Sequence, residues 1–249
     1  ILLLVAIFFG ILLIFAVYTI GLFKSSDYTK DNFDDAKGKI AVVEIEGVIM
    51  ESKGVVEKLK LAQESKDIAA IIVSINSPGG AVGPSQEIYE EMRRIDTNKE
   101  AGKPVYASFG TVAASGGYYI GSAARKIYAN PGTITGSIGV IMQFMDLSKL
   151  YEWAKIAPNT LKAGKYKDVG QPGRPMTPEE NELMQKMLKG VHKQFIADIM
   201  KVRGQKIKGN IEEHAQGQIF SGAEALDIGL VDELAGIYEA LELPELAVE

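Results

Sequence analysis

The sequence predicts an α/β fold with a mostly parallel sheet, and two observations support this fold class. The order strand, glycine turn, helix occurs twice in succession, over residues 67–95 and 104–124. Residues 67–76 (DIAAIIVSIN) are almost continuously apolar, which is typical of a strand buried on both faces of a parallel sheet. Because parallel βαβ units bind ligands at the carboxyl ends of their strands, the glycine turns at 77–80 and 115–117 are expected to face one crevice.

Residues 1–23 (ILLLVAIFFGILLIFAVYTIGLF) carry no charge. About 20 apolar residues in a helix cross a hydrocarbon core of roughly 30 Å, so this segment is predicted to be a transmembrane anchor. A cleaved signal peptide is the alternative. Its apolar region would span about 7–15 residues and end in a small-residue cleavage site, and no such site precedes Lys24. Residues 24–39 have the polar composition of a linker, and residues 40–249 are predicted to form the folded domain.

The domain is expected to alternate strands and helices as far as residue 130. The predicted strands are 40–45, 67–76, 104–109 and 126–130, and the predicted helices are 55–65, 84–95 and 118–124. Gly110 is expected to end the third strand, because a string of small residues follows it.

Beyond Ile141 the pattern becomes more helical. The segments expected here are a helix at 146–153, a turn-rich stretch at 159–175, a long helix at 177–202 and a last helix after Asp232. Thr177, followed by proline and two glutamates, is typical of a capped helix start. The long helix carries an apolar stripe that is predicted to face the core rather than a cofactor: Leu183, Met187, Val191, Phe195 and Ile199.

Composition excludes several classes of function. The net charge of −5 gives no overall basic surface for nucleic acid. The absence of cysteine excludes disulfides, thiolate catalysis and cysteine–metal sites. With only two histidines, no dedicated metal site is expected, and the sequence calls for no cofactor.

Ser115 is the candidate nucleophile. It lies where a strand is expected to turn into a helix, with alanines before it and glycines after it. Unpaired backbone N–H groups at a helix start favour the negative charge that forms when a carbonyl is attacked, and small neighbours let a substrate backbone come close. The alternative is that Ser115 is only a helix N-cap.

A nucleophilic serine needs a base. His192 and His214 both occupy surface helix positions beside charged residues, outside any glycine turn, so neither is favoured as the base. A lysine can act instead if desolvation lowers its pKa. Lys162, Lys165 and Lys167 lie in the turn-rich segment, and composition does not choose among them.

Four motifs in register resemble the signal peptide peptidase A family, which is peptidase family S49. They are NSPGG at 76–80, AASGGYY at 113–119, NPGTITGSIGV at 130–140 and KYKD at 165–168, while GAEALDIGLVD at 222–232 is less specific. The likeness covers about residues 40–236. It implies a ClpP/crotonase-like fold and a membrane-anchored serine protease with a Ser-Lys dyad.

The resemblance also implies a role for individual residues. Ser115 matches the nucleophile, and Lys167, just before Asp168, matches the general base. Ser137 matches the serine that orients the lysine amine. The backbone N–H groups of Gly80 and Gly116 match the oxyanion donors.

The family further implies partners and a location. Its short, single-repeat members form homo-oligomers in which the serine of one protomer meets the lysine of its neighbour, so a homo-octamer is expected here. The expected substrates are remnant signal peptides, hydrophobic peptides left after signal peptidase has released them. The expected location is the inner membrane, crossed once by residues 1–23, with the catalytic domain on the extracytoplasmic side.

Three other functions stay open at this point. One is another membrane-bound Ser-Lys protease, of the type that cleaves stomatin-like proteins. The second is a crotonase-type acyl-CoA enzyme, which uses similar glycine turns but no serine nucleophile. The third is a non-catalytic ring that only binds peptides.

Overall fold

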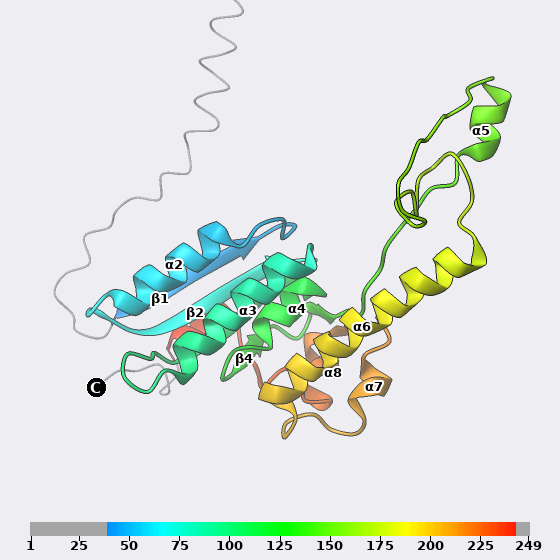
Figure 1. The fold of residues 1–249 in the computed structure, drawn as a ribbon. Coiled ribbons are helices and arrows are strands. Elements are labelled where there is room, and N and C mark those ends of the chain that lie inside the picture. Colours follow the sequence, from blue (N-terminus) through cyan, green and yellow to red (C-terminus); the bar gives the residue numbers. More distant parts are fainter. Residues whose placement is uncertain (1–38, 243–249) are drawn as a thin grey trace, which may run out of the picture. The chain divides into compact units, whose positions relative to one another are not determined.

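A sheet of seven strands forms the centre of residues 39–242, the part of the chain that the computed structural model describes (Figure 1). Five strands pair in parallel in the order β1-β2-β3-β4-β7. Their bounds are β1 Lys39–Glu46, β2 Ile68–Ser77, β3 Val105–Ala114, β4 Ile127–Ala129 and β7 Glu233–Leu234. A short strand, β5 (Ile134–Gly136), pairs in parallel with β3, and β6 (Ile219–Ser221) pairs antiparallel with β5. The predicted α/β fold with a mostly parallel sheet is confirmed.

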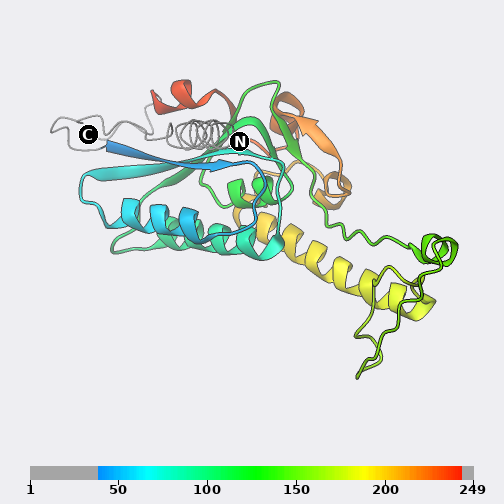
Figure 2. The same ribbon diagram turned by 90° about the horizontal axis from the view of Figure 1, so that it is seen from above.

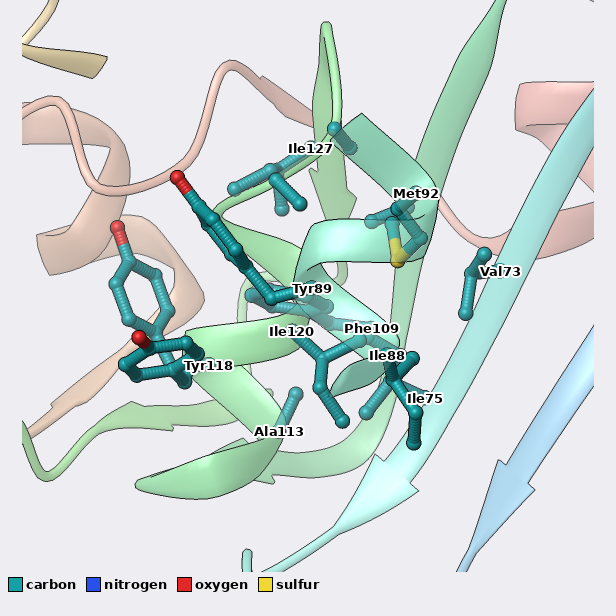
Figure 3. Close-up of a cluster of buried hydrophobic side chains, with 14 of the residues drawn as sticks. Val73, Ile75, Ile88, Tyr89, Met92, Phe109, Ala113, Tyr118, Ile120 and Ile127 are labelled. Carbon is teal, nitrogen blue, oxygen red and sulfur yellow. The ribbon is translucent and has the colours of Figure 1, made fainter. Parts of the chain in front are cut away.

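Helices cover both faces of the sheet (Figure 2). On one face lie α2 (Lys53–Glu64), α3 (Val82–Thr97) and α4 (Gly116–Gly121), and on the other lies α9 (Ile237–Leu241). Figure 3 shows the larger core, in which Val73 and Ile75 of β2 meet Ile88 and Met92 of α3. The apolar run of β2 is therefore buried against a helix layer, as its composition predicts.

The predicted end of the third strand at Phe109 is wrong. β3 continues through Gly110 to Ala114, because it gains a new partner in β5 after its pairing with β2 shifts register. The Asn76 side chain spans this shift: its Oδ1 accepts the Val112 N–H at 3.3 Å. The helix that follows occupies Gly116–Gly121 rather than 118–124, since it begins directly after the turn at Ser115.

An arm, defined here as residues 141–177, extends away from the sheet (Figures 1 and 2). It contains α5 (Ser148–Trp153) and the predicted turn-rich loop, and it leads into α6 (Pro178–Arg203). The predicted core stripe of α6 is confirmed only in its second half. Phe195 and Ile199 are buried, but Leu183 and Met187 are 42% and 43% exposed, because the first half of α6 accompanies the arm.

The remaining elements are short. They are α7 (Ile211–His214) and α8 (Gly222–Asp227), which precede β7. Within residues 39–242 no helix is both long enough and apolar enough to cross a membrane. The predicted anchor at 1–23 and the linker up to residue 38 lie outside the described residues, so the domain boundaries stay a prediction.

A buried ion pair fastens the end of α6 to the sheet. The Arg203 side chain is fully buried; it lies 2.8 Å from Asp232 and donates to the Gly229 carbonyl at 2.9 Å. Asp232 also accepts the Ile127 N–H at 2.8 Å, at the start of β4. Burial alone would raise the pKa of Asp232, but the hydrogen bond and charge of Arg203 outweigh burial and hold that pKa below its usual value.

We expect Arg203→Met to lower the free energy of unfolding by about 3 kcal/mol, because it leaves a poorly solvated carboxylate without its main partner. Lys206 also pairs with Asp232, at 2.8 Å, but its side chain is 38% exposed, so Lys206→Met should cost less than about 1 kcal/mol. Urea unfolding of both variants at one protein concentration measures the difference. Equal losses in the two variants would contradict this account.

Candidate active site

Ser115 occupies the turn between β3 and α4 in a conformation that side-chain-bearing residues rarely adopt, with φ at +53°. Its N–H donates to the Gly136 carbonyl at 2.9 Å, which ties the turn to β5. Although Ser115 stands at the N-cap position, its side chain makes no capping hydrogen bond. The N-cap alternative is therefore wrong, and the Ser115 hydroxyl does not cap the helix. A strained backbone at such a turn is characteristic of nucleophile sites.

The turn at Gly79 and Gly80 packs directly against Ser115. A Cβ atom added to Gly79 would lie 2.6 Å from the Gly116 nitrogen and 2.9 Å from the Ser115 Cβ. Gly79 also has φ at +99°, so only glycine fits this position without strain. The two glycine turns face one crevice, as predicted from their places at the ends of β2 and β3.

Two backbone amides in this crevice have no partner. Among the residues that the structure describes, neither the Gly80 N–H nor the Gly116 N–H donates a hydrogen bond, whereas the neighbouring Ala81 N–H donates to Ile49 at 2.7 Å. A Cβ atom added to Gly116 would come within 3.2 Å of the Gly80 nitrogen, so the two amides lie close together. Two unpaired N–H groups this close together beside a hydroxyl can hold an oxyanion.

Ser137 lies next to Ser115 for a topological reason. Ala114 of β3 is in register with Gly136 of β5, so the next residue of each strand is a serine. Ser137 also has a positive φ, of +50°, and its N–H donates to the Gln218 carbonyl at 2.8 Å. The parallel pairing therefore places both candidate serines at the same edge of the sheet.

The pocket beside Ser115 has mostly apolar walls. Its lining residues are Gly80, Val82, Ser85, Ser115, Gly116, Tyr119, Gly139, Val140, Val191 and Phe195. Such walls suit an apolar side chain of a peptide. None of these lining residues is lysine, histidine, aspartate or glutamate, so residues 39–242 of the same chain supply this pocket with no such base for Ser115.

The tyrosine in the pocket is not a candidate base. Burial and a hydrogen bond to the Asp198 carboxylate raise the pKa of Tyr119. Tyr89 also donates to Asp198, at the backbone carbonyl, over 2.8 Å, and burial raises the pKa of Tyr89 to about 12. Both phenols stay protonated at neutral pH. Neither Tyr119 nor the buried Ser85 stands out as a pocket residue from sequence alone, because a stripe pattern on a helix cannot separate them from ordinary core residues.

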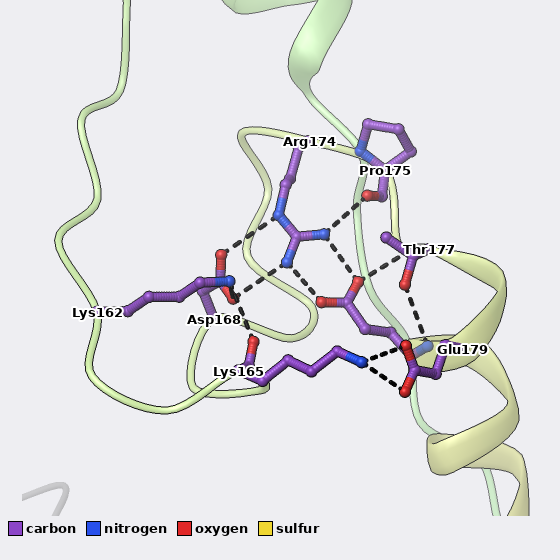
Figure 4. Close-up of polar contacts among 8 residues, drawn as sticks. Lys162, Lys165, Asp168, Arg174, Pro175, Thr177 and Glu179 are labelled. Atoms are coloured by element: carbon purple, nitrogen blue, oxygen red, sulfur yellow. Dashed lines mark hydrogen bonds and ion pairs between the residues drawn. The ribbon is translucent and has the colours of Figure 1, made fainter.

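The three candidate lysines all lie in the arm, and their surroundings differ. Lys162 Nζ is 2.6 Å from Asp168, and Lys165 Nζ is 2.6 Å from Glu179 (Figure 4). The hydrogen bond to Glu179 raises the pKa of Lys165. Lys167 is exposed, and in the described part of the chain its amine has no hydrogen bond or ion pair. In both ribbon views the arm lies apart from α4, which follows Ser115.

Neither histidine belongs to the crevice. His192 lines a neighbouring groove that shares Gly139 and Val140 with the Ser115 pocket, and its Nε2 is buried without a partner among the described residues. His214 Nε2 lies 3.1 Å from the Lys208 carbonyl oxygen. His192 is thus less exposed than the predicted surface position, and that neither histidine acts as the base stays a prediction. Within residues 39–242 no cluster of His, Cys, Asp and Glu could hold a metal ion.

The sequence of this chain matches two peptidase families. The sequence profile of peptidase family S49 matches residues 97–248, and that of Clp protease matches residues 39–133. A candidate protease of Synechocystis sp. is 39% identical over 79% of this chain and 69% of its own length. A candidate signal peptide peptidase SppA of Enterococcus faecium is 32% identical over 88% of this chain and 67% of its own length.

Two further matches are informative. The chloroplastic serine protease SPPA of Arabidopsis thaliana is 34% identical, and the aligned region covers 83% of this chain and 32% of that protein. Among solved structures, a mutant of the 1510-N membrane-bound stomatin-specific protease superposes with a TM-score of 0.53 at 19% identity, covering 84% of this chain and 85% of that one. At this identity the likeness supports the ClpP/crotonase-like fold alone.

The fold and its crevice define a serine peptidase of the ClpP-like class. Within this class the chain belongs to peptidase family S49 and is of the SppA type. The crotonase-type and non-catalytic readings of the sequence are therefore set aside.

Proposed function

We propose that this protein is a membrane-anchored serine endopeptidase that degrades remnant signal peptides by means of a Ser115–Lys167 dyad. The observation that carries the proposal is the crevice at Ser115. There, among the described residues, the Ser115 hydroxyl makes no capping hydrogen bond, two backbone amides have no partner, and no lysine, histidine or carboxylate of the same chain lines the pocket. The apolar pocket walls favour hydrophobic peptides, as remnant signal peptides are. Two relatives whose names include SppA support the same substrate class.

In the proposed reaction the neutral amine of Lys167 accepts the proton of the Ser115 hydroxyl while the Ser115 Oγ attacks the scissile carbonyl. The N–H groups of Gly80 and Gly116 hold the oxyanion, and each such donor contributes roughly 10²–10³ in rate. The protonated amine then gives its proton to the leaving nitrogen, and water releases the acyl group by the reverse sequence. Ser137, beside Ser115, orients the amine.

The choice of Lys167 over its neighbours rests on their partners. Lys162 and Lys165 each bind a carboxylate, of Asp168 and Glu179, and the hydrogen bond to Glu179 raises the pKa of Lys165, which disfavours its neutral form. Lys167 makes no such pair with any residue in the range 39–242, so its amine can bind at the surface of another protomer. Burial of its amine there would favour the neutral form that a base requires.

We further propose that the dyad forms between protomers of a homo-octamer. The Ser115 pocket contains no lysine, and the arm that carries Lys167 lies apart from α4, so a neighbouring copy is the natural source of the base. Residues 1–23 would anchor each protomer in the inner membrane by a single span, with residues 40–249 on the extracytoplasmic side next to the substrates.

Ser115→Ala should abolish peptidase activity and fluorophosphonate labelling, since both need the hydroxyl, while the mass of the assembly stays unchanged. Peptide mapping of the labelled wild-type protein should find the adduct on Ser115. Turnover of a synthetic signal peptide, compared with that of a stomatin segment, tests the substrate class. Faster cleavage of the stomatin segment would favour the other type of membrane-bound Ser-Lys protease.

Lys167→Ala should reduce kcat by at least about 10²-fold, the lower range for loss of general-base catalysis. Lys165→Ala is the matched control, because it removes an exposed lysine two residues away that is paired with Glu179. It should change kcat less than twofold. The reverse pattern would move the base to Lys165.

Mixing inactive Ser115→Ala and Lys167→Ala protomers should restore part of the activity if the dyad spans protomers, since some interfaces would combine an intact serine with an intact lysine. The mixture must be dissociated and reassembled before the assay. Absence of recovery in verified mixed oligomers would place the dyad within one chain.

A further inference from the structure

Arg174 lies at the centre of a polar cluster in the arm (Figure 4). Its two terminal nitrogens donate to the two carboxylate oxygens of Glu180, at 2.8 and 2.6 Å. The same guanidinium reaches Asp168 from the other side: Nη2 lies 3.1 Å from Oδ1, and Nε donates to Oδ2 at 3.3 Å. One arginine therefore joins two carboxylates that lie 12 residues apart in the sequence.

Glu180 is the fixed end of this cluster. It stands in the first turn of α6 and forms a capping box with Thr177, whose N–H donates to the Glu180 carboxylate at 2.9 Å. The Glu180 N–H in turn donates to the Thr177 hydroxyl at 3.2 Å. Because α6 continues into the buried core at Phe195, Glu180 belongs to a rigid element that reaches the body of the domain.

Asp168 is the other end, and it directly follows Lys167. Its side chain is 9% exposed and that of Glu180 is 6% exposed, so both carboxylates are largely shielded from water, while the Arg174 side chain between them is 30% exposed. By contrast, Lys165 and Glu179 pair in the same loop with side chains 65% and 56% exposed. Such an exposed ion pair does little to fix the position of the loop. The hydrogen bond from Arg174 lowers the pKa of Glu180 to about 2, so the clamp stays charged throughout the neutral range.

We propose that Arg174 is a positioning residue for the reaction: by clamping Asp168 to Glu180 it fixes the backbone from which Lys167 is presented to Ser115 of the neighbouring protomer. This inference rests on the proposed dyad. The Lys167 amine has no partner of its own in the described chain, so its place is set through its backbone and its neighbours. The Lys167 N–H donates to the Gly164 carbonyl at 3.2 Å, which adds a local turn but no link to α6.

The geometry requires arginine. A planar guanidinium has five N–H donors in a fixed fork, so Arg174 binds Glu180 through two nitrogens and still reaches Asp168, whereas a lysine carries all its donors on one atom and cannot reproduce this arrangement. A displacement of a catalytic group by about 1 Å can cost roughly 10²-fold in rate. Loss of the clamp should therefore lower kcat strongly and leave KM nearly unchanged, because the apolar pocket beside Ser115 is built from other elements.

The first test compares two adjacent glutamates in the full-length assembly. Glu180→Gln keeps the shape and the ability to cap Thr177 but removes the charge that Arg174 binds, and it should lower kcat about 10- to 100-fold. Glu179→Gln makes the same change one residue earlier, where the partner is the exposed Lys165, and it should alter kcat less than twofold. Arg174→Lys should behave like Glu180→Gln. Equal kcat values for Glu180→Gln, Arg174→Lys and the wild type would overturn the proposal.

The second test asks whether the defect lies in the arm. Arg174→Gln protomers retain an intact Ser115, so mixing them with Ser115→Ala protomers should restore activity, while mixing them with Lys167→Ala protomers should not. If Arg174→Gln caused a general folding defect, neither mixture would recover activity, and this outcome would overturn the proposal. If Lys167→Ala alone keeps full activity, the dyad itself is wrong. If Lys167→Ala is inactive and Arg174→Gln is fully active, only the positioning role is wrong.

Discussion

The parallel pairing of β3 with β5 is the constraint on which the rest of the site depends. Ala114 is in register with Gly136, and the Thr135 hydroxyl donates to the Ala113 carbonyl at 2.7 Å, so the two strand ends are locked together. The Ser115 N–H then donates to Gly136 and holds a strained turn in place. Only a closely packed surrounding maintains such a backbone, and here the glycine turn of β2 provides it.

Helix α6 connects two parts with different physical roles. Its second half is buried through Phe195, Ile199 and Arg203 and belongs to the core. Its first half begins with a capping box and carries the clamp that holds the arm. A rigid helix of 26 residues thus links the pocket at Ser115, which Phe195 helps to line, to the loop of Lys167.

In the proposed mechanism the nucleophile and the base lie in different parts of the protomer, and this separation makes proteolysis depend on assembly. Under the proposed mechanism the body supplies the nucleophile and the oxyanion donors, and the arm supplies the base to another copy. A lone protomer would then have a serine without a base, because among residues 39–242 the only titratable group that lines the pocket is a tyrosine whose pKa is raised. Activity would appear only on assembly, which confines peptide cleavage to the finished particle.

The sequence by itself determined the α/β class, the order of most helices and strands, the capped start of α6 and the two glycine turns at strand ends, because these depend on local periodicity and turn chemistry. Only the tertiary structure decided that β3 runs past Gly110 and that the Ser115 hydroxyl is not a cap. It also decided that Lys162 and Lys165 are paired while Lys167 has no partner in the part of the chain that the structure describes. Each of these results depends on a partner that pattern alone does not identify: β5 for the strand, and Asp168 and Glu179 for the lysines. Local patterns do not specify which polar groups meet, since that is fixed by packing between segments.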